Sequence, residues 1–253
     1  MAAVTLSERQ RSKLMSFLHT CSGIYVGDES KTLRFISAIL WMVRSGSAWE
    51  LLPEQYGKWN SVYKRFARWS ERGIWQRMHA HFADDPDLEC LLLDSTVIRA
   101  HPCAAGASAK QGGQQEQALG RSRGGFSTKI HIVVDALGNP LDFVLTAGQA
   151  HDVKQGPTLL QGRHCDYVIA DKAYDADAFL QSIEAMGAIP VIPARKNRTE
   201  PRHLDAHLYK ERHLVECFIN KIKWYRRIFS RFDKLASRFL GFLSFVAALI
   251  WLR

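Results

Sequence analysis

The chain has 253 residues, of which 47% are hydrophobic and 23% are charged, with 17 Gly and 8 Pro. These proportions exclude a disordered, collagen-like or disulfide-framework protein. The length suits one large domain, or a small domain joined to one of about 150 residues. Basic side chains outnumber acidic ones by 34 to 25, a net charge of +9 that favours a polyanionic partner.

The charge is distributed unevenly along the chain. Residues 1–85 carry +4, residues 86–194 carry −4, residues 195–234 carry +7 and residues 235–253 carry +2. An acidic middle between basic flanks favours a chain that holds metal ions at its centre and nucleic acid on either side. A solvated surface of uneven charge would give the same totals, so this alternative stays open.

The cysteine pattern and the apolar segments bear on the compartment. Five cysteines stand far apart with no C-x-x-C pair, which is typical of reduced thiols in a cytosolic protein. The N-terminus has no apolar run of the kind found in a secretion signal. The apolar stretch 239–252 falls short of the roughly 20 residues that a bilayer span needs. We therefore expect a buried terminal helix and a cytoplasmic protein without membrane association.

Residues 1–85 have helical patterns throughout. Ser7 and Gln10 form a capping-box pattern that opens a helix running to about Thr20, and a second helix over 32–45 stops at Gly46. The segment NSVYKRFARWS has apolar residues on one side and, on the other, a basic face made of Ser61, Lys64, Arg65 and Arg68. This third helix resembles the recognition element of a helix-turn-helix, although an ordinary solvated face has the same pattern.

The pattern changes near Asp84-Asp85-Pro86, where we expect a boundary between domains at 1–85 and 86–253. Beyond it, CLLLDS reads as a strand, and 101–125 as a long polar loop. Residues 127–148 form two strand-like runs around Leu-Gly-Asn, a hairpin signal. Further helices and strands alternate, with long helices in the basic last third. The predicted order β-β-β-α-β-α-β-α indicates a mixed α/β layer domain.

Three acidic residues are candidates for chemistry. Asp94 and Asp171 each follow four apolar strand residues, and burying an unpaired charge is costly. The two could share a cation, or each could cap a helix or turn. Glu216 lies on a predicted helical stripe with Tyr209, Arg212 and Lys223, opposite an apolar stripe. That polar stripe could equally be a solvated face.

Several blocks of the sequence are similar to one family. LLLDSTVIRAH, ALGRSRGGFSTKIHIVVDALGNPLDFVLTAGQAHD, VIADKAYD and the spacing Y-x2-R-x3-E-x6-K (Tyr209, Arg212, Glu216, Lys223) resemble DDE transposases of bacterial insertion sequences, in particular the group called insertion sequence five. The similarity covers essentially the whole chain, including GKWNSVYKRFARWSERGIW. His151-Asp152 lies in one of these blocks, where a structural hydrogen bond is more plausible than a catalytic role.

The resemblance implies an RNase H-like catalytic core with an N-terminal helical DNA-binding domain and C-terminal helices. It further implies that Asp94, Asp171 and Glu216 bind two Mg²⁺ ions, for which Mn²⁺ could substitute. Hard divalent cations take carboxylate oxygens, and a pair about 4 Å apart can activate the attacking oxygen and stabilise the leaving one. Water would then cut the phosphodiester at the ends of the element, and the freed 3′-OH would attack target DNA.

The resemblance also implies double-stranded DNA partners, namely terminal inverted repeats and target DNA, and at least a homodimer for paired cleavage. Arg212 and Lys223 would hold phosphates, and Tyr209 would stack on a base or position a phosphate. The remaining basic residues expected to contact DNA are Arg121, Arg123, Lys129, Arg195, Lys196, Arg198, Lys221, Arg226 and Arg227. Two alternatives stay open: a non-catalytic DNA-binding repressor or architectural protein derived from a transposase, and a structure-selective RNase H-like nuclease.

Overall fold

A computed structural model describes residues 5–196, 198 and 204–252. The N-terminal part is helical, as predicted. Its α-helices are α1 (Glu8–Thr20), α2 (Glu29–Ser45), α3 (Trp59–Glu71) and α4 (Ile74–Phe82), with 3-10 turns η1 (Trp49–Leu51) and η2 (Glu54–Tyr56) between α2 and α3. The Ser7–Gln10 capping box is present at the start of α1. Helix α2 ends at Gly46, which adopts the left-handed conformation (φ 66°) that glycine tolerates best.

The middle of the chain forms a mixed sheet. Its strands are β1 (Cys90–Ala100), β2 (Gly120–Ser122), β3 (Gly125–Val134), β4 (Pro140–Ala147), β5 (Tyr167–Ala170), β6 (Ile189–Val191) and β7 (Ser230–Arg231). The order is β2-β3-β1-β5-β6, with β4 paired to β3 and β7 to β1. Strands β1, β3 and β4 form an antiparallel meander, whereas β5 and β6 run parallel to β1 and follow helical crossovers. An antiparallel meander extended by two parallel strands is the RNase H-like arrangement.

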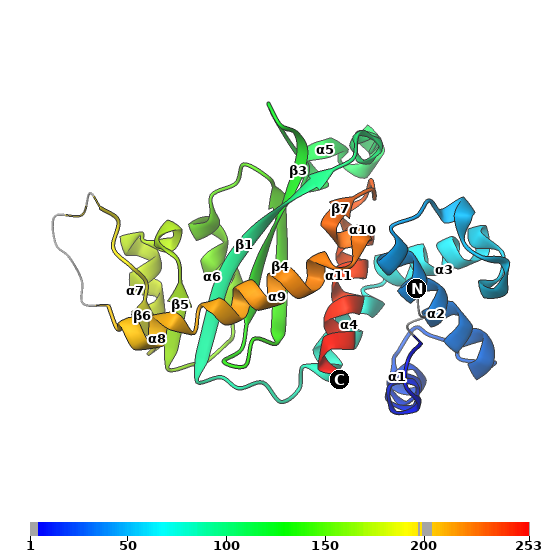
Figure 1. The fold of residues 1–253 in the computed structure, drawn as a ribbon, viewed down its shortest axis with the longest axis horizontal. Helices are drawn as coiled ribbons and strands as arrows, with labels where there is room; N and C mark the ends of the chain where they lie inside the picture. The colour runs from blue at the N-terminus through cyan, green and yellow to red at the C-terminus, as the bar shows by residue number, and fades with distance from the viewer. Residues whose placement is uncertain (1–4, 197, 199–203, 253) are drawn as a thin grey trace.

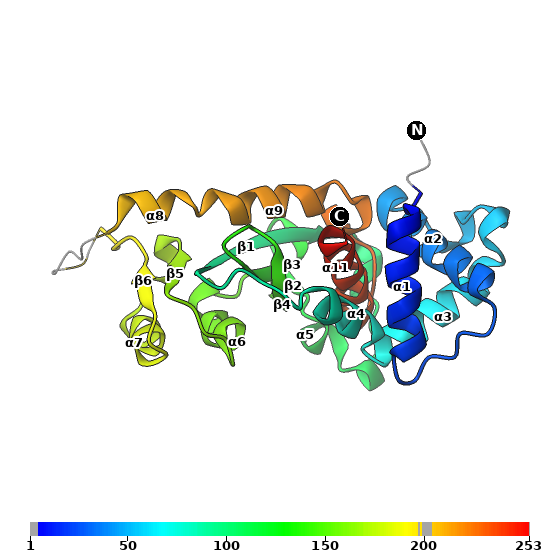
Figure 2. The same cartoon turned by 90° about the horizontal axis from the view of Figure 1, so that it is seen from below.

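Helices cover both faces of this sheet (Figures 1 and 2). Helices α8 (Ala206–Lys210) and α9 (His213–Lys223) run along one face, and α6 (Gly156–Leu160) and α7 (Asp177–Ala185) lie on the other. Side chains of β1 alternate accordingly. Leu92 and Ile98 belong to the core shared with α9, whereas Leu91 and Leu93 belong to the core under α6 and α7. Each face of β1 therefore has its own apolar layer.

The C-terminal helix joins the two parts of the chain. Helix α11 (Ala236–Trp251) follows α10 (Arg226–Phe229) and packs against α3 and α4. Its Phe242 stacks on Phe66 of α3, with ring centroids 4.2 Å apart, and its Phe245 lies edge-on to Trp75 of α4. The apolar stretch 239–252 is thus a buried helix, as predicted. None of the helices in the described ranges is long and apolar enough to span a membrane.

Two predicted boundaries are wrong. Strand β1 does not end at Asp94 but continues to Ala100, because residues 95–99 pair with β3. The predicted continuous helix around Glu216 is interrupted at Glu211-Arg212 between α8 and α9. The loop at 101–125 is also more ordered than expected, since it contains β2, short α5 (Gly113–Glu116) and the turns η3 (Pro102–Ala105) and η4 (Ala109–Gln111). The hairpin, β5, α7 and β6 lie where the sequence predicts them.

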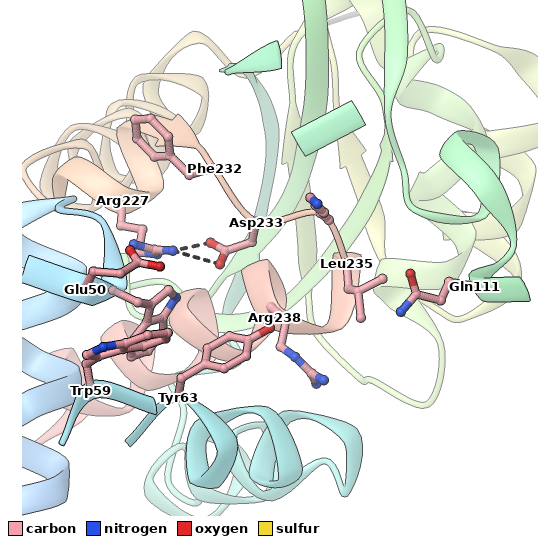
Figure 3. A pocket seen from close by; sticks show the side chains of 11 residues that line it. Glu50, Trp59, Tyr63, Gln111, Arg227, Phe232, Asp233, Leu235 and Arg238 are labelled. Carbon is pink, nitrogen blue, oxygen red and sulfur yellow. Dashed lines mark hydrogen bonds and ion pairs between the residues drawn. The ribbon is translucent and has the colours of Figure 1, made fainter. Parts of the chain in front are cut away.

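Arg227, expected to contact DNA, is a structural residue. It lines a cavity of about 310 Å³ between the N-terminal helices and the C-terminal segment (Figure 3). Its guanidinium makes two hydrogen bonds to Asp233, at 3.0 and 3.2 Å, and lies over the rings of Trp49 and Phe242. Its side chain is 4% exposed, so it has no surface to offer to a phosphate.

We predict that Arg227→Ala lowers the free energy of unfolding by about 3–5 kcal/mol, because it leaves Asp233 as an uncompensated buried charge. Arg226→Ala, on the exposed neighbouring residue, is the matched control and should change stability by less than about 0.5 kcal/mol. Urea unfolding of both variants measures the difference. A stable Arg227→Ala protein that binds DNA poorly would instead support the original expectation.

Candidate active site

The register of two parallel strands places Asp94 beside Asp171. Strands β1 and β5 pair from Cys90 with Tyr167 to Leu93 with Ala170, so Asp94 and Asp171 are the next residues in register. Both carboxylates are partly buried. Asp171 follows β5 directly and accepts a hydrogen bond from the Ala173 amide (2.8 Å), which caps the turn η6 (Lys172–Tyr174). Asp171 therefore caps this turn and also lies beside Asp94, so the two roles predicted for it are compatible.

Arg212 connects the third carboxylate to this pair. It precedes α9, and its Nη1 donates to Asp94 Oδ2 at 3.2 Å, while its Nη2 donates to Glu216 Oε1 one turn along the helix. Helix α9 is held in place by buried Val215, Phe218 and Ile222, which face the sheet. The Arg212 guanidinium, just before this helix, joins the carboxylates of Asp94 and Glu216, which are 122 positions apart in the chain.

The carboxylates act on one another through their charges. The pKa of Asp94 is raised to about 6, chiefly by burial and to a smaller extent by the charges of Asp171 and Glu216, while the Ser95 amide and Arg212 oppose the shift. Burial works against the charge of Arg212, but the carboxylates of Glu216 and Asp94 outweigh it and raise the pKa of that guanidinium. The site thus has more negative charge than its one bound guanidinium neutralises.

This donor set fits a hard divalent cation. Three carboxylates supply only oxygen ligands, and their mutual repulsion favours any cation that enters among them. In the structure the Arg212 guanidinium takes that place between Asp94 and Glu216. Within the described ranges no three acidic, histidine or cysteine side chains stand at metal-binding spacing. Metal binding would therefore require these side chains to move closer together, away from Arg212.

The other members of the predicted stripe lie near the carboxylates. The guanidinium of Arg212 lies over the ring of Tyr209, 5.9 Å from its centroid, and Tyr209 is half-buried on α8. Lys223 is half-buried in the last turn of α9. Of the other residues predicted to contact DNA, most are exposed: Ser61, Lys64, Arg68, Arg121, Arg123, Arg195, Lys196, Lys221 and Arg226.

Three further basic residues predicted to contact DNA make side-chain contacts within the protein. Arg65 is half-buried, with its guanidinium 4.4 Å from the Phe35 ring centroid and its Nη2 donating to Thr32. Lys129 is 12% exposed and donates to Asp152. Arg198 donates to both carboxylate oxygens of Asp175 and pairs with Asp177. Their partners lie on other elements, so the sequence alone did not reveal these contacts.

Asp175 also has a different role from the one expected. The residue was predicted to cap α7, but the helix begins after Ala176 and has no side-chain cap. The carboxylate of Asp175 is instead buried and accepts hydrogen bonds from the Arg195 amide and from Arg198. It ties the segment after β6 to the turn that follows Asp171.

Sequence reasoning missed Ser95 and left Asp152 without a role. Ser95 donates its amide to Asp94 Oδ1 and its hydroxyl to Asp152 Oδ1, both at 2.7 Å. Two signals pointed here: the serine that follows Asp94 in LLLDS and the His151-Asp152 pair in a family block. Neither indicates by itself that the two would meet.

Comparisons with known proteins agree with this geometry. Residues 85–251 match the family described as "Transposase DDE domain", and residues 12–79 match "Putative transposase of IS4/5 family (DUF4096)". Because the first match spans well over half of the chain, the protein belongs to the family of DDE-domain transposases. The prediction of an insertion-sequence transposase with an RNase H-like core is confirmed.

Individual relatives are bacterial. The chain is 46% identical over 133 residues to a putative transposase for insertion sequence element IS6501 of Brucella ovis, covering 51% of this chain and all of that protein. It is 32% identical over 135 residues to a putative transposase for IS402 of Burkholderia cepacia, covering 49% of this chain and 62% of that protein. Among solved structures, a piggyBac transposase synaptic complex with hairpin DNA aligns at 12% identity and a TM-score of 0.43, over 76% of this chain and 48% of that one.

The raised pKa of Asp94 gives a prediction for the metal-free protein in chelator. Because the folded state holds the Asp94 proton up to about pH 6, against an ordinary 3.8, wild-type stability falls as pH rises through that window. Asp94→Asn has no carboxyl proton to release, so its stability does not fall in this way. Relative to wild type, the variant should therefore gain about 2–3 kcal/mol between pH 4 and pH 7. Urea unfolding at both pH values measures this, and a pH-independent difference between the two proteins would contradict it.

Proposed function

We propose that this protein is an Mg²⁺-dependent DNA transposase that binds the terminal inverted repeats of an insertion sequence, cleaves the phosphodiester at each end, and joins the freed 3′-OH to target DNA. The observation that carries the proposal is that Asp94 lies next to Asp171 in the β1–β5 register and is joined to Glu216 by the Arg212 guanidinium. Membership of the DDE-domain family supports the same reaction class.

Asp94, Asp171 and Glu216 would hold the divalent cations, whose chemistry there is to activate the attacking oxygen and to stabilise the leaving one. The chain then needs no side-chain nucleophile, since water and later a DNA 3′-OH supply the attacking oxygen. Cations held by the carboxylates would neutralise them, and the Arg212 guanidinium would then be free to bind a phosphate bidentately. Tyr209 and Lys223 flank it and would position the same strand.

The exposed basic residues would hold DNA on both sides of this site. Helix α3 presents Lys64 and Arg68, with Ser61 one turn earlier, and these would read or grip the terminal repeat. Lys221 and Arg226 would continue the phosphate track beyond α9, while Arg121 and Arg123 would contact strand ends near the β2–β3 turn. Paired cleavage of two ends implies that at least two copies assemble on DNA.

The reaction is tested with purified protein, a labelled element end, target DNA and Mg²⁺. Cleavage followed by joining supports the transposase, cleavage alone indicates a nuclease, and retention of DNA without cutting indicates a repressor. Asp94→Ala should lower cleavage by about 1,000-fold or more, because it removes several kcal/mol of metal-assisted stabilisation. End binding, measured by gel shift, should stay nearly unchanged. Parallel loss of binding and cutting would refute the separation of the two functions.

Recognition of the element end by α3 is tested with substitutions of three of its basic residues. Lys64→Ala combined with Arg68→Ala should weaken binding of the terminal repeat and reduce the slope of log affinity against log salt by about 2, one for each lost phosphate contact. Arg65→Ala is the matched comparison. It should keep the salt slope and instead lower stability by about 1–2 kcal/mol, because it removes the Phe35 and Thr32 contacts. An unchanged slope in the double variant would exclude α3 as the recognition surface.

A further inference from the structure

A buried polar layer lies directly behind the catalytic strand. Since side chains alternate along β1, Asp94 faces α9, whereas Ser95 faces the opposite side, with Leu91 and Leu93. On that side the neighbouring strand β3 places His131 opposite Ser95 and Lys129 opposite Val97. Asp152, the first residue of η5 (Asp152–Gln155), completes the layer.

Hydrogen bonds connect this layer to the active site through Ser95. The Ser95 hydroxyl donates to Asp152 Oδ1 at 2.7 Å, and the Ser95 amide donates to Asp94 Oδ1 at the same distance. Lys129 Nζ donates to Asp152 Oδ1 at 2.9 Å and to the Ala150 carbonyl at 2.7 Å. One residue therefore bridges a catalytic carboxylate on one face of the sheet and a buried ion pair on the other.

The charges and hydrogen-bonding groups of this layer are costly to bury. Side chains of Asp152 and Lys129 are 20% and 12% exposed, so the pair is held largely out of water. Burial lowers the pKa of His131 to about 4, which keeps the ring neutral, and its Nδ1 lies 3.6 Å from Asp152 Oδ1. In the described part of the chain, His131 Nδ1 and the Tyr174 hydroxyl are buried without a hydrogen-bond partner. An apolar layer would cost less, so stability does not explain this one.

We propose that Asp152 is a positioning residue for Asp94: held by Lys129, it fixes the Ser95 hydroxyl, and through the Ser95 amide it fixes the Asp94 carboxylate. Oδ1 of Asp94 is then restrained, and Oδ2, which accepts a hydrogen bond from Arg212, is the oxygen that can exchange its partner. Lys129 neutralises Asp152 and so prevents a fourth carboxylate from adding to the repulsion at the site. This inference rests on the proposed function, because it assigns Asp152 and Ser95 to the same reaction.

The test compares Ser95→Ala with Ser95→Thr and with a control serine on the same side of the sheet. Ser95→Ala removes the hydroxyl bond but keeps the amide bond, so cleavage of end DNA should slow by about 10–100-fold with end binding unchanged. Ser95→Thr restores the hydroxyl and should restore cleavage. Ser182→Ala removes a hydroxyl that donates to the Phe179 carbonyl, away from the carboxylates, and should cleave like wild type.

A second readout does not need catalysis. Titration of the DNA-free protein with Mn²⁺, followed by electron paramagnetic resonance, should show about 10-fold weaker binding in Ser95→Ala and wild-type binding in Ser182→Ala. Ser95→Ala combined with Asp152→Ala should be no less active than the less active of the two single variants, because each substitution alone already removes the hydrogen bond between the Ser95 hydroxyl and residue 152.

The outcomes separate this inference from the proposed function. The positioning role is wrong if Ser95→Ala cuts DNA and binds Mn²⁺ like wild type. If wild type cuts and Asp94→Ala does not, the proposed transposase function still stands in that case. Failure of Ser95→Thr to restore cleavage, or additive losses in the double variant, would also overturn the role. If wild type neither cuts DNA nor binds Mn²⁺, the proposed function and this inference both fail.

Discussion

Repulsion among three carboxylates is the constraint on which the site depends. The β1–β5 register sets Asp94 beside Asp171, and α9 adds Glu216 across from them. Folding such a cluster is unfavourable unless a cation shares it. Arg212 provides such a cation, since its two guanidinium nitrogens pair with Asp94 and Glu216. In the proposed function, this guanidinium would turn to DNA phosphate when metal ions take its place between the carboxylates.

The rest of the fold holds this cluster in place. Helix α9 is fixed against the sheet by buried Val215, Phe218 and Ile222, and Arg212 just before its start reaches Asp94 on β1. That core continues through α10 and α11 into the N-terminal helices, where Phe242 stacks on Phe66. The expected boundary near residue 85 is thus crossed by a shared apolar core. A substitution in the helical segment can therefore affect the carboxylates, so stability must be measured with every activity.

Local signals in the sequence predicted most of the elements. The Ser7 capping box, Gly46 at the end of α2, and the Leu-Gly-Asn turn of the hairpin act through neighbouring residues, and each lies where expected. Asp94 and Asp171 could be singled out because a charged residue after an apolar run is costly to bury, and Glu216 because it lies on a polar helical stripe. The extension of β1 beyond Asp94 was missed because the apolar run stops at that charged residue, and only pairing with β3 shows that the strand continues.

The sequence did not show which individual basic side chains are buried and which are exposed. Arg65 and Arg68 look equivalent on the helical wheel, but packing of α2 against α3 buries only the first against Phe35. Arg227 and Arg226 are neighbours, and only Arg227 meets Asp233 and Trp49. Such contacts depend on tertiary packing between segments far apart in the chain. The hydrogen bonds from Asp152 through Ser95 to Asp94 also depend on such packing, so the sequence did not predict them.

The most direct measurement is a crystal structure of the protein grown or soaked with Mn²⁺, with anomalous diffraction data to locate the metal. We expect anomalous density in contact with Asp94, Asp171 and Glu216, and the Arg212 guanidinium displaced from Asp94. Density elsewhere in the molecule, or a guanidinium still bridging Asp94 and Glu216 at saturating Mn²⁺, would contradict the exchange of one cation for another on which the proposed chemistry depends.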